Sequence, residues 1–360
     1  MKKIGIDARL YSQTGVGTYI NNLLHYLQKE PVKDITFYVF IMEKEMEKVK
    51  LTDSRFIKVP VRSVWHSFAE QIQFLNILNK YKLDLMHFTY FSFPILYKKP
   101  FVATIHDLTP IYFKTGSSST RSPATYLMKF YVLKYMLHIQ INSSKFIFTP
   151  SSHVKSQILK YSSKDISNKI IVTQEGVSHD LKHFNIQSKD VILPDNYMLY
   201  VGNFYPHKNV DFLIDAFIDL NQDRHYLVLV GPSNVFSDKL KNKFKNFSEK
   251  KIIFLHKITN NQISEVYSRA SVLVNPSISE GFGLPLVEAL YFNCPVLASN
   301  IAPFVEILGD KANYFNPYEK ASLIKQLQNV KNLKTVNLKD EFDFEKMTKK
   351  TLFIYKKAIS

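Results

Sequence analysis

Cysteine is nearly absent from this sequence, since Cys294 stands alone among 360 residues. A single cysteine excludes a disulfide framework within the chain and a zinc site made of cysteine ligands, and it favours a reducing compartment. A signal-peptide core is also lacking, because the charged residue Asp7 follows Lys2 and Lys3 too closely for an apolar run to lie between them. We therefore expect a cytoplasmic protein whose first residues form a strand.

Long apolar runs are missing as well. The longest apolar stretch, residues 124–141, is interrupted by Lys129, Lys134, His138 and Gln140. A membrane-spanning helix needs roughly 20 mostly apolar residues, so this stretch does not qualify. Its pattern predicts a long amphipathic helix, which either packs on a sheet or leans on a membrane surface.

Positive charge is in excess, with 47 basic and 31 acidic residues and a net charge of +16. Such a balance suits nucleic acid, an anionic membrane surface or a polyphosphate substrate. The lysines are spread along the chain, and no aromatic and basic recognition motif is present, so we expect no nucleic-acid partner. A peripheral contact with anionic lipid on the inner face of the membrane remains a hypothesis. It rests on Lys80, Lys82, Lys98, Lys99, Lys114, Lys129 and Lys134.

The fold class is predicted from the alternation of strand-like and helix-like segments. Hydrophobic residues make up 46% of the chain, and its length allows two domains. Strands that alternate with helices indicate parallel sheets with crossover helices, an α/β fold. The expected strands are 4–8, 35–40, 56–59, 83–88, 101–105, 145–149, 197–202, 226–231, 252–255, 271–275 and 295–298. The expected helices include 18–28, 67–81, 154–160 and 210–220.

The domain boundary is placed where this alternation fades into polar residues, between Gly176 and Asn196. We predict a Rossmann-like domain over residues 1–185 and a second one over residues 186–343. Residues 344–360 have a helical period, and this helix either closes the second domain or crosses back to brace the first.

One loop between a strand and a helix has the features of an anion site. Gly281 and Gly283 allow a tight turn after the strand 271–275, and Pro285 suits the first position of the next helix. Such a unit points free backbone N–H groups and the positive end of a helix dipole outward. Glu280 lies on this loop, and Glu288 lies about one turn into the helix.

Polar or glycine-rich loops follow other predicted strands. Gly15 and Gly17 lie in the first such loop and match a dinucleotide-binding fingerprint only partly, because Ile20 takes the place of the third glycine. His106 and Asp107 follow the strand 101–105, where an open α/β sheet places its ligand contacts.

Together these motifs resemble the retaining glycosyltransferases of family 4. The resemblance covers nearly the whole chain and implies a GT-B fold, in which two Rossmann-like domains face each other across a cleft. Its central element is the pair Glu280 and Glu288, with seven residues between the two carboxylates. Supporting elements are Gly15-Val16-Gly17, His106-Asp107, Gly202 with Pro206-His207-Lys208-Asn209, and Val305-Glu306 ahead of Gly309-Asp310.

The resemblance assigns roles to these residues. His106 and Glu280 are the expected catalytic pair, both at the donor sugar, and Glu288 would accept hydrogen bonds from the ribose hydroxyls. Lys208 would neutralise the leaving diphosphate in the way a metal does elsewhere. Each of these residues also has a purely structural interpretation. Glu288 could be a solvated helix glutamate and Glu280 a turn carboxylate without a substrate contact. Lys208 could be an exposed lysine at a helix start, and His106 a histidine satisfied by the adjacent backbone. The expected donor-binding set is Gly15, Gly17, Asn203, Lys208, Gly281, Phe282, Gly283, Leu284 and Glu288.

Two positions depart from the family pattern. Asn203 and His207 stand where many members carry arginine, so Lys208 becomes the main expected cation. No Asp-x-Asp pair stands at a strand end, so we expect neither a metal nor a cofactor besides the nucleotide diphosphate sugar, which is a co-substrate.

The implied function is retaining transfer of a sugar to a saccharide or lipid-linked oligosaccharide acceptor on the first-domain side, in surface polysaccharide biosynthesis. The stretch 206–209 favours mannose from GDP-mannose. A retaining route uses either a covalent carboxylate intermediate or front-face displacement. The sequence offers no well-placed nucleophile, and the resemblance favours the front-face route. A sugar-nucleotide epimerase with the GT-B fold and a non-catalytic GT-B partner subunit are the alternatives.

Overall fold

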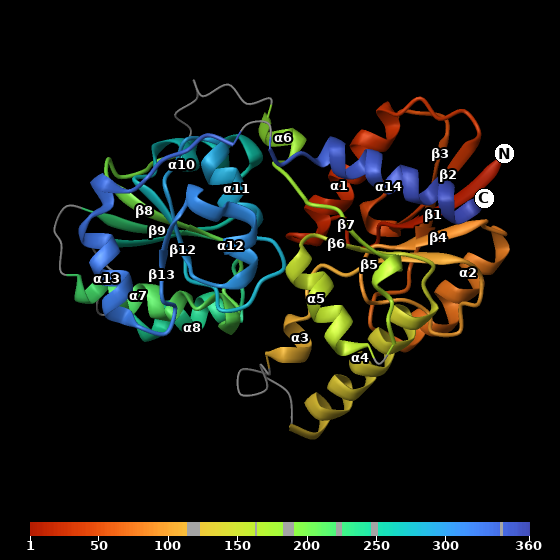
Figure 1. Ribbon diagram of the computed structural model, residues 1–360, viewed down its shortest axis with the longest axis horizontal. Helices are drawn as coiled ribbons and strands as arrows, with labels where there is room; N and C mark the ends of the chain where they lie inside the picture. The colour runs from red at the N-terminus through yellow and green to blue at the C-terminus, as the bar shows by residue number, and fades with distance from the viewer. Residues whose placement is uncertain (114–122, 163, 183–190, 221–224, 246–250, 339–340) are drawn as a thin grey trace. The chain divides into compact units, whose positions relative to one another are not determined.

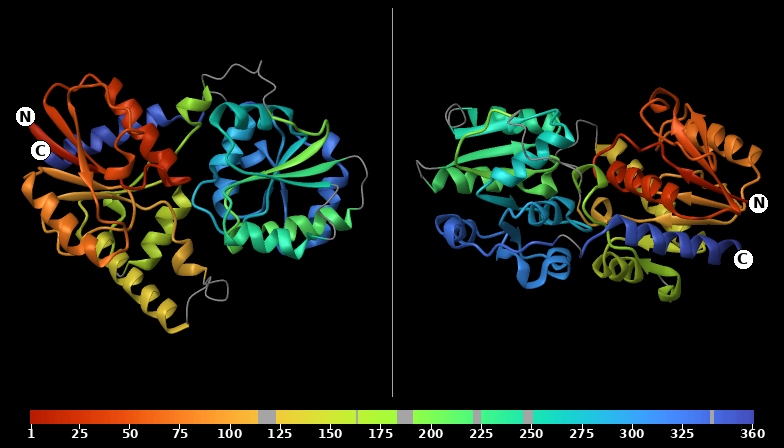
Figure 2. Two further views of the ribbon diagram at one scale, coloured as in Figure 1. Left: turned by 180° about the vertical axis from the view of Figure 1, so that it is seen from behind. Right: turned by 90° about the horizontal axis from the view of Figure 1, so that it is seen from above.

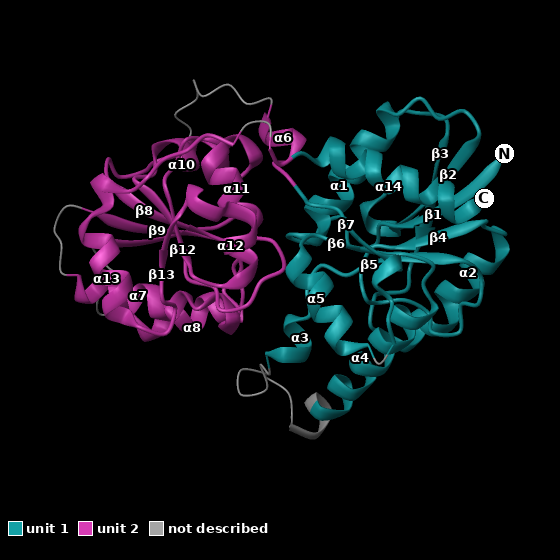
Figure 3. Cartoon of the chain, viewed as in Figure 1, with its two compact units in different colours: residues 1–175, 343–360 teal, residues 176–342 magenta. Residues whose placement is uncertain are grey.

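The computed structural model describes residues 1–113, 123–162, 164–182, 191–220, 225–245, 251–338 and 341–360. The chain divides into two compact units, Met1–Glu175 with Asp343–Ser360 and Gly176–Phe342 (Figure 3). The first division lies at 175/176, ten residues before the position predicted from the polar composition. The physical reason is that α6 (His179–Lys182) already packs in the second unit, where Asp180 accepts a hydrogen bond of 3.0 Å from Asn260.

The first unit is built on a sheet of seven parallel strands in the order β3-β2-β1-β4-β5-β6-β7. The central strand β1 pairs with β2 on one side and β4 on the other, and Ile4 lies opposite Phe37 and Leu85. Short apolar strands of this kind are typical of parallel sheets covered on both faces. The strands are β1 (Lys2–Asp7), β2 (Ile35–Met42), β3 (Phe56–Val61), β4 (Leu85–Phe88), β5 (Phe101–Thr104), β6 (Ile147–Thr149) and β7 (Ile170–Val172).

Helices cover both faces of this sheet (Figure 2). The segment 67–81, predicted as one helix, is a π-helical turn followed by a short α-helix. The described helices are α1 (Val16–Lys29), η1 (Glu43–Glu45), η2 (Glu70–Phe74), α2 (Leu75–Lys80), α3 (Thr109–Tyr112), α4 (Pro123–Ser143), α5 (Ser152–Tyr161), η4 (Ser167–Lys169) and α14 (Phe344–Ile359).

The last helix, α14, belongs to the first unit although it follows the second unit in sequence. It lies against α1 (Figure 1). The hydroxyl of Tyr355 is 2.5 Å from Nδ1 of His87, and both side chains are fully buried. Of the two arrangements open from the sequence, α14 therefore has the one in which it braces the first domain.

The second unit has a sheet of six parallel strands in the order β10-β9-β8-β11-β12-β13. Alternate residues of β8 face opposite sides, so Tyr197 and Leu199 belong to one hydrophobic core and Met198 and Tyr200 to the other. The strands are β8 (Tyr197–Val201), β9 (Tyr226–Val230), β10 (Ile252–Leu255), β11 (Val272–Asn275), β12 (Val296–Ser299) and β13 (Asn313–Phe315).

The helices of the second unit pack on both faces of its sheet. In both units the strand order reverses beside the first strand, between β1 and β4 and between β8 and β11. Ligands of open α/β sheets bind at such points, beyond the carboxyl ends of the strands. The helices are α6, η5 (Pro206–Lys208), α7 (Val210–Asp219), α8 (Val235–Lys243), α10 (Asn260–Arg269), α11 (Leu284–Tyr291), α12 (Ala302–Leu308), η6 (Gly309–Lys311), α13 (Lys320–Gln328) and η7 (Val330–Asn332).

None of the helices described is both long enough and apolar enough to cross a membrane. Helix α4 packs on the first unit through Met136 and Leu137, which are buried in its hydrophobic cores. The expectation of an amphipathic helix is wrong for α4, because its exposed side also carries apolar residues, Leu127 and Met128 among them. Lys114 lies outside the described residues, and the peripheral contact with anionic lipid stays a prediction.

Candidate active site

The glycine loop of the second unit leads from the end of β11 at Asn275 to the start of α11. The helix begins at Leu284, so Pro285 is its second residue and not its first as predicted. Gly283 precedes the helix with φ 99°, in the left-handed region that favours glycine. A Cβ atom at Gly283 would lie 2.8 Å from the ring of Phe304. The turn thus requires glycine for its backbone conformation and for its close packing.

Phe282 is a buried core residue and not an exposed contact. Its side chain is 4% exposed, and its ring meets that of Phe342 edge to face at 5.8 Å. A donor contact from Phe282 can therefore come only from its backbone, as for the neighbouring Gly281. Leu284 is half-buried at the start of the helix and packs against the same core.

Glu280 and Lys208 form an ion pair between Oε1 of the carboxylate and Nζ of the ammonium group. The two side chains are 14% and 18% exposed, so this pair is largely withdrawn from solvent. Ser277 supports the carboxylate, because its hydroxyl lies 3.2 Å from the same oxygen of Glu280 and 2.7 Å from Oδ1 of Asn275. The predicted cation and the predicted sugar-binding carboxylate therefore share one site.

The loops that carry these two residues are also joined through the backbone. The N–H of Ile278 donates a hydrogen bond of 2.9 Å to the carbonyl oxygen of His207. Tyr200 donates a hydrogen bond of 2.5 Å to the carbonyl oxygen of Asn203, which fixes the start of the other loop. These contacts bring the loops after β8 and β11 together at the point where the strand order reverses. The ring of His207 stacks on Tyr205, and the phosphate roles considered for Asn203 and His207 stay predictions.

Glu288 lies in α11 and accepts a hydrogen bond of 2.8 Å at Oε2 from the hydroxyl of Tyr267 in α10. Burial raises the pKa of the Glu288 carboxyl to about 7, and the hydrogen bond from Tyr267 acts in the opposite direction. The ring of Tyr267 is itself fully buried and stacks on Phe292 at 5.9 Å. Tyr267 was not recognised from the sequence, because a tyrosine in a helix looks like an ordinary core residue.

His106 follows β5 in the first unit and is held from both sides of its ring. Nδ1 lies 3.1 Å from Oε1 of Glu175, and Nε2 lies 3.1 Å from the carbonyl oxygen of Thr89. The edge of the ring meets Tyr19 at 4.9 Å between centroids. Each ring nitrogen thus has a polar partner within this unit. The predicted contact of His106 with the donor sugar stays a prediction, and Glu175 is a partner that the sequence did not reveal.

Gly15 and Gly17 have different structural roles. Gly17 lies inside α1, which begins at Val16, so it is not a loop residue as predicted. A Cβ atom at Gly17 would lie 2.3 Å from the carbonyl oxygen of Tyr11, and glycine therefore lets the preceding loop fold onto the helix. Gly15 has φ 70°, and no described atom lies within 4 Å of its Cβ position. Of the two, Gly15 is the one whose backbone is open to approach.

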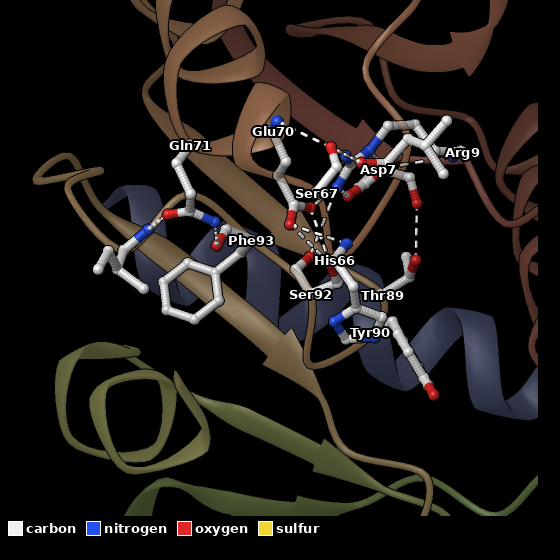
Figure 4. Close-up of polar contacts among 12 residues, drawn as sticks. Asp7, Arg9, His66, Ser67, Glu70, Gln71, Thr89, Tyr90, Ser92 and Phe93 are labelled. Atoms are coloured by element: carbon white, nitrogen blue, oxygen red, sulfur yellow. Dashed lines mark hydrogen bonds and ion pairs between the residues drawn. The ribbon is translucent and has the colours of Figure 1, made fainter. Parts of the chain in front are cut away.

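A buried ionic cluster that the sequence did not predict lies at the carboxyl end of β1 (Figure 4). The guanidinium of Arg9 binds both oxygens of Asp7, at 2.9 and 2.7 Å, and its Nη2 also binds Oε1 of Glu70 at 2.7 Å. The hydroxyl of Ser92 donates to Glu70 at 2.8 Å and accepts the N–H of His66 at 2.9 Å. This cluster ties together the segments that follow β1, β3 and β4. Burial raises the pKa of Glu70, and Arg9 opposes that shift.

Family models match almost the entire chain. The model described as Glycosyltransferase Family 4 covers residues 13–181, and the model described as Glycosyl transferases group 1 covers residues 182–350. The O-antigen chain mannosyltransferase RfbU of Salmonella typhimurium is 31% identical over 291 residues, 79% of this chain and 76% of that protein. The O-antigen chain mannosyltransferase B of Escherichia coli is 26% identical over 298 residues, 78% of this chain and 76% of that protein.

Solved glycosyltransferase structures share the fold. Sucrose-phosphate synthase from Thermosynechococcus elongatus aligns with a TM-score of 0.76 at 16% identity, over 99% of both chains. HepE of Anabaena, solved with UDP and glucose, aligns with a TM-score of 0.73 at 14% identity, over 99% of this chain and 100% of that chain. These likenesses establish the GT-B fold. With the two family models and the RfbU relative, they show that this chain is a member of glycosyltransferase family 4, with a group 1 glycosyl transferase domain over residues 182–350.

Proposed function

We propose that this glycosyltransferase moves mannose from GDP-mannose to a saccharide or lipid-linked oligosaccharide acceptor, with retention at the anomeric carbon and without a metal. The observation that carries the proposal is the ion pair of Lys208 with Glu280 beside the glycine loop. The site offers a cation for a diphosphate and a carboxylate for a sugar hydroxyl. The names of RfbU and of mannosyltransferase B support mannose as the sugar and surface polysaccharide as the product.

Binding of the donor would exchange partners within this pair. The diphosphate takes Lys208, and a hydroxyl of the donor sugar replaces the ammonium group at Glu280. The N–H groups of the turn at Gly281 and Gly283 then face the sugar or the phosphate, because glycine permits a close backbone approach. Glu288 accepts hydrogen bonds from the ribose hydroxyls, while Tyr267 keeps its carboxylate oriented.

The transfer itself is proposed as a front-face displacement. The bond between the anomeric carbon and the phosphate oxygen breaks, and the acceptor oxygen forms its bond on the same face. The proton of the acceptor hydroxyl passes to the leaving phosphate oxygen. Lys208 stabilises the charge that develops on the diphosphate, and Glu280 lies near the positive charge that develops on the sugar.

Donor choice is tested by a thermal-shift screen of the full chain against GDP-mannose, UDP-glucose, dTDP-glucose and ADP-glucose. GDP-mannose is expected to stabilise the protein most, and preference for another nucleotide would overturn the donor assignment. Transfer is then measured with a saccharide acceptor, with and without EDTA, and the anomeric configuration of the product is determined by NMR. Loss of activity in EDTA would refute metal independence, and an inverted product would refute retention.

The two alternative functions give other products. An isomerised donor sugar formed without an acceptor would indicate an epimerase. Donor binding without any turnover, across a panel of acceptors, would indicate a non-catalytic partner subunit.

A further inference from the structure

Four polar side chains form a continuous series of hydrogen bonds in the interior of the first unit. Nδ1 of His87 lies 2.5 Å from the hydroxyl of Tyr355, and Nε2 lies 2.7 Å from Oγ1 of Thr104. The same Oγ1 lies 3.0 Å from the hydroxyl of Tyr19. Each of the four residues is at most 2% exposed. This series, which we call the buried chain, therefore links α14, β4, β5 and α1 away from solvent.

The hydrogen bonds of the buried chain must all run in one direction. Burial lowers the pKa of His87 to about 3, so its ring is neutral and has one N–H donor and one acceptor nitrogen. Each hydroxyl has a single hydrogen to donate. If Nε2 of His87 accepts from Thr104, then Tyr19 must donate to Thr104, and Nδ1 must donate to Tyr355. The other tautomer reverses all three bonds, so the four side chains depend on one another as a unit.

One end of the buried chain lies beside His106. The ring of Tyr19 meets the ring of His106 at 4.9 Å between centroids and 81° between planes. Glu175 and the carbonyl oxygen of Thr89 lie at the two nitrogens of His106, and Tyr19 provides the aromatic contact. Tyr19 is thus held at its hydroxyl by Thr104 and presents its ring to His106. The position of the His106 ring depends in this way on the side chain that packs against it.

We propose that the buried chain holds the ring of His106 in place for the transfer, so that Tyr19, Thr104, His87 and Tyr355 are positioning residues. This inference rests on the proposed function, with His106 as a catalytic residue at the donor sugar. A displacement of a catalytic group by about 1 Å can slow a reaction on the order of 10²-fold, so residues distant from the substrate can affect turnover. The alternative is that these polar groups only satisfy one another inside the core.

Two substitutions at Thr104 separate positioning from packing. Thr104→Val keeps the shape of the side chain and removes the hydroxyl, whereas Thr104→Ser keeps the hydroxyl and removes a methyl group. For transfer from GDP-mannose to a saccharide acceptor, Thr104→Val is expected to lower kcat about tenfold with little change in the KM for the donor. Thr104→Ser is expected to retain the kcat of the parent chain. Equal kcat values of the two variants would overturn the proposal.

The far end of the buried chain gives a second test. Tyr355→Phe removes only the hydroxyl and should also lower kcat, with folding checked by circular dichroism. Because both residues act through one chain, Thr104→Val/Tyr355→Phe should have the same kcat as Thr104→Val alone. The matched control is Thr351→Val, which removes another fully buried hydroxyl of α14, one that donates to the carbonyl oxygen of Met347, and should leave kcat unchanged. Single losses that multiply in the double variant would overturn the proposal.

NMR of isotope-labelled histidine separates this proposal from the proposed function, because it needs no activity. The ring signal of His106, assigned with the variant His106→Asn, is expected to shift or broaden in Tyr355→Phe and to stay in place in Thr351→Val. An unchanged His106 signal in Tyr355→Phe, in a chain that does transfer mannose, would refute the positioning role alone. A shifted signal in a chain without any transfer activity would refute the proposed function alone.

Discussion

Tyr267 and Glu288 form a pair in which the hydroxyl of the buried Tyr267 donates a hydrogen bond of 2.8 Å to one carboxylate oxygen of the half-buried Glu288. The pair joins α10 to α11 within the second unit. Two effects on the pKa of the Glu288 carboxyl oppose each other: burial favours the neutral acid, and the hydrogen bond favours the carboxylate. With a pKa of about 7, Glu288 changes its charge within the range of ordinary assay conditions.

The affinity for the donor should therefore rise with pH. A carboxylate accepts two hydrogen bonds from a ribose diol, whereas the neutral acid does so less well. We expect the Kd for GDP-mannose to fall between pH 6 and pH 8, with a midpoint near the pKa of about 7. Isothermal titration calorimetry in several buffers should also detect proton release on binding near neutral pH. A Kd that does not change over this range would contradict the assignment of Glu288 to the ribose.

The same residue should destabilise the fold at high pH. Its pKa in the folded protein lies above the ordinary value of 4.5, so its stabilising effect is complete below pH 4.5 and is lost as pH rises through about 7. The variant Glu288→Gln removes this cost, on the order of 1 to 3 kcal/mol at pH 8. Its Tm should therefore exceed that of the parent chain at pH 8, while its affinity for the donor falls. A lower Tm of Glu288→Gln at pH 8 would contradict the argument.

Tyr267 should act as a positioning residue for Glu288. Tyr267→Phe removes the hydrogen bond that lowers the pKa of Glu288, so the pH midpoint of donor binding should move upward. At pH 7 the KM for the donor should rise about tenfold, one hydrogen bond to a charged group being worth roughly 1.5 kcal/mol, with a smaller effect on kcat. Tyr226→Phe, at an exposed tyrosine of β9, is the control. An unshifted pH profile would leave Tyr267 with a packing role only.

Lys208 and Glu280 should be essential to turnover and coupled to each other. Lys208→Ala and Glu280→Ala are each expected to lower kcat by about 10² to 10³, with the fold retained. Because the two side chains pair, the fold-decrease of kcat in the double variant should be smaller than the product of the two single fold-decreases. Lys243→Ala, which removes an exposed pair with Asp211, should leave kcat unchanged. Near-normal transfer by either single variant would show that the site is assigned wrongly.

Arg9 should be a major determinant of the stability of the first unit. Arg9→Met leaves the carboxylates of Asp7 and Glu70 buried without their cation, a loss of about 3 to 5 kcal/mol in the free energy of unfolding. Arg62→Ala, which removes an ion pair with Glu43 on the surface, should cost less than about 1 kcal/mol. Urea denaturation followed by circular dichroism measures both. Equal effects of the two substitutions would contradict a structural role for the buried cluster.

Local patterns were sufficient to predict most of the sheet strands and the glycine loop. The strands are short apolar runs between polar segments, and the loop from Glu280 to Pro285 is a contiguous motif. The strands β7 (Ile170–Val172) and β13 (Asn313–Phe315) were missed because three residues show too little of a pattern. The domain boundary was predicted at 185/186 and lies at 175/176, because polar composition continues into residues that already pack in the second unit.

The contacts that were not predicted join residues distant in sequence. Glu70 lies 61 positions from Arg9, and Glu175 lies 69 positions from His106. Tyr267 precedes Glu288 by 21 positions. A single sequence identifies which residues can carry charge or donate a hydrogen bond, and it does not show which of them the topology brings together. The ion pair of Lys208 with Glu280 depends in the same way on the strand order β8-β11.

The position of α14 has a consequence for the order of folding during synthesis. The second unit is one continuous segment, residues 176–342, and it is synthesised in full before α14 is made. The first unit needs residues 343–360 as well, and Tyr355 must reach His87 in its interior. Domains generally fold as units as they emerge. The unit that begins first in the sequence is therefore completed last, because its closing helix is synthesised after the whole of the second unit.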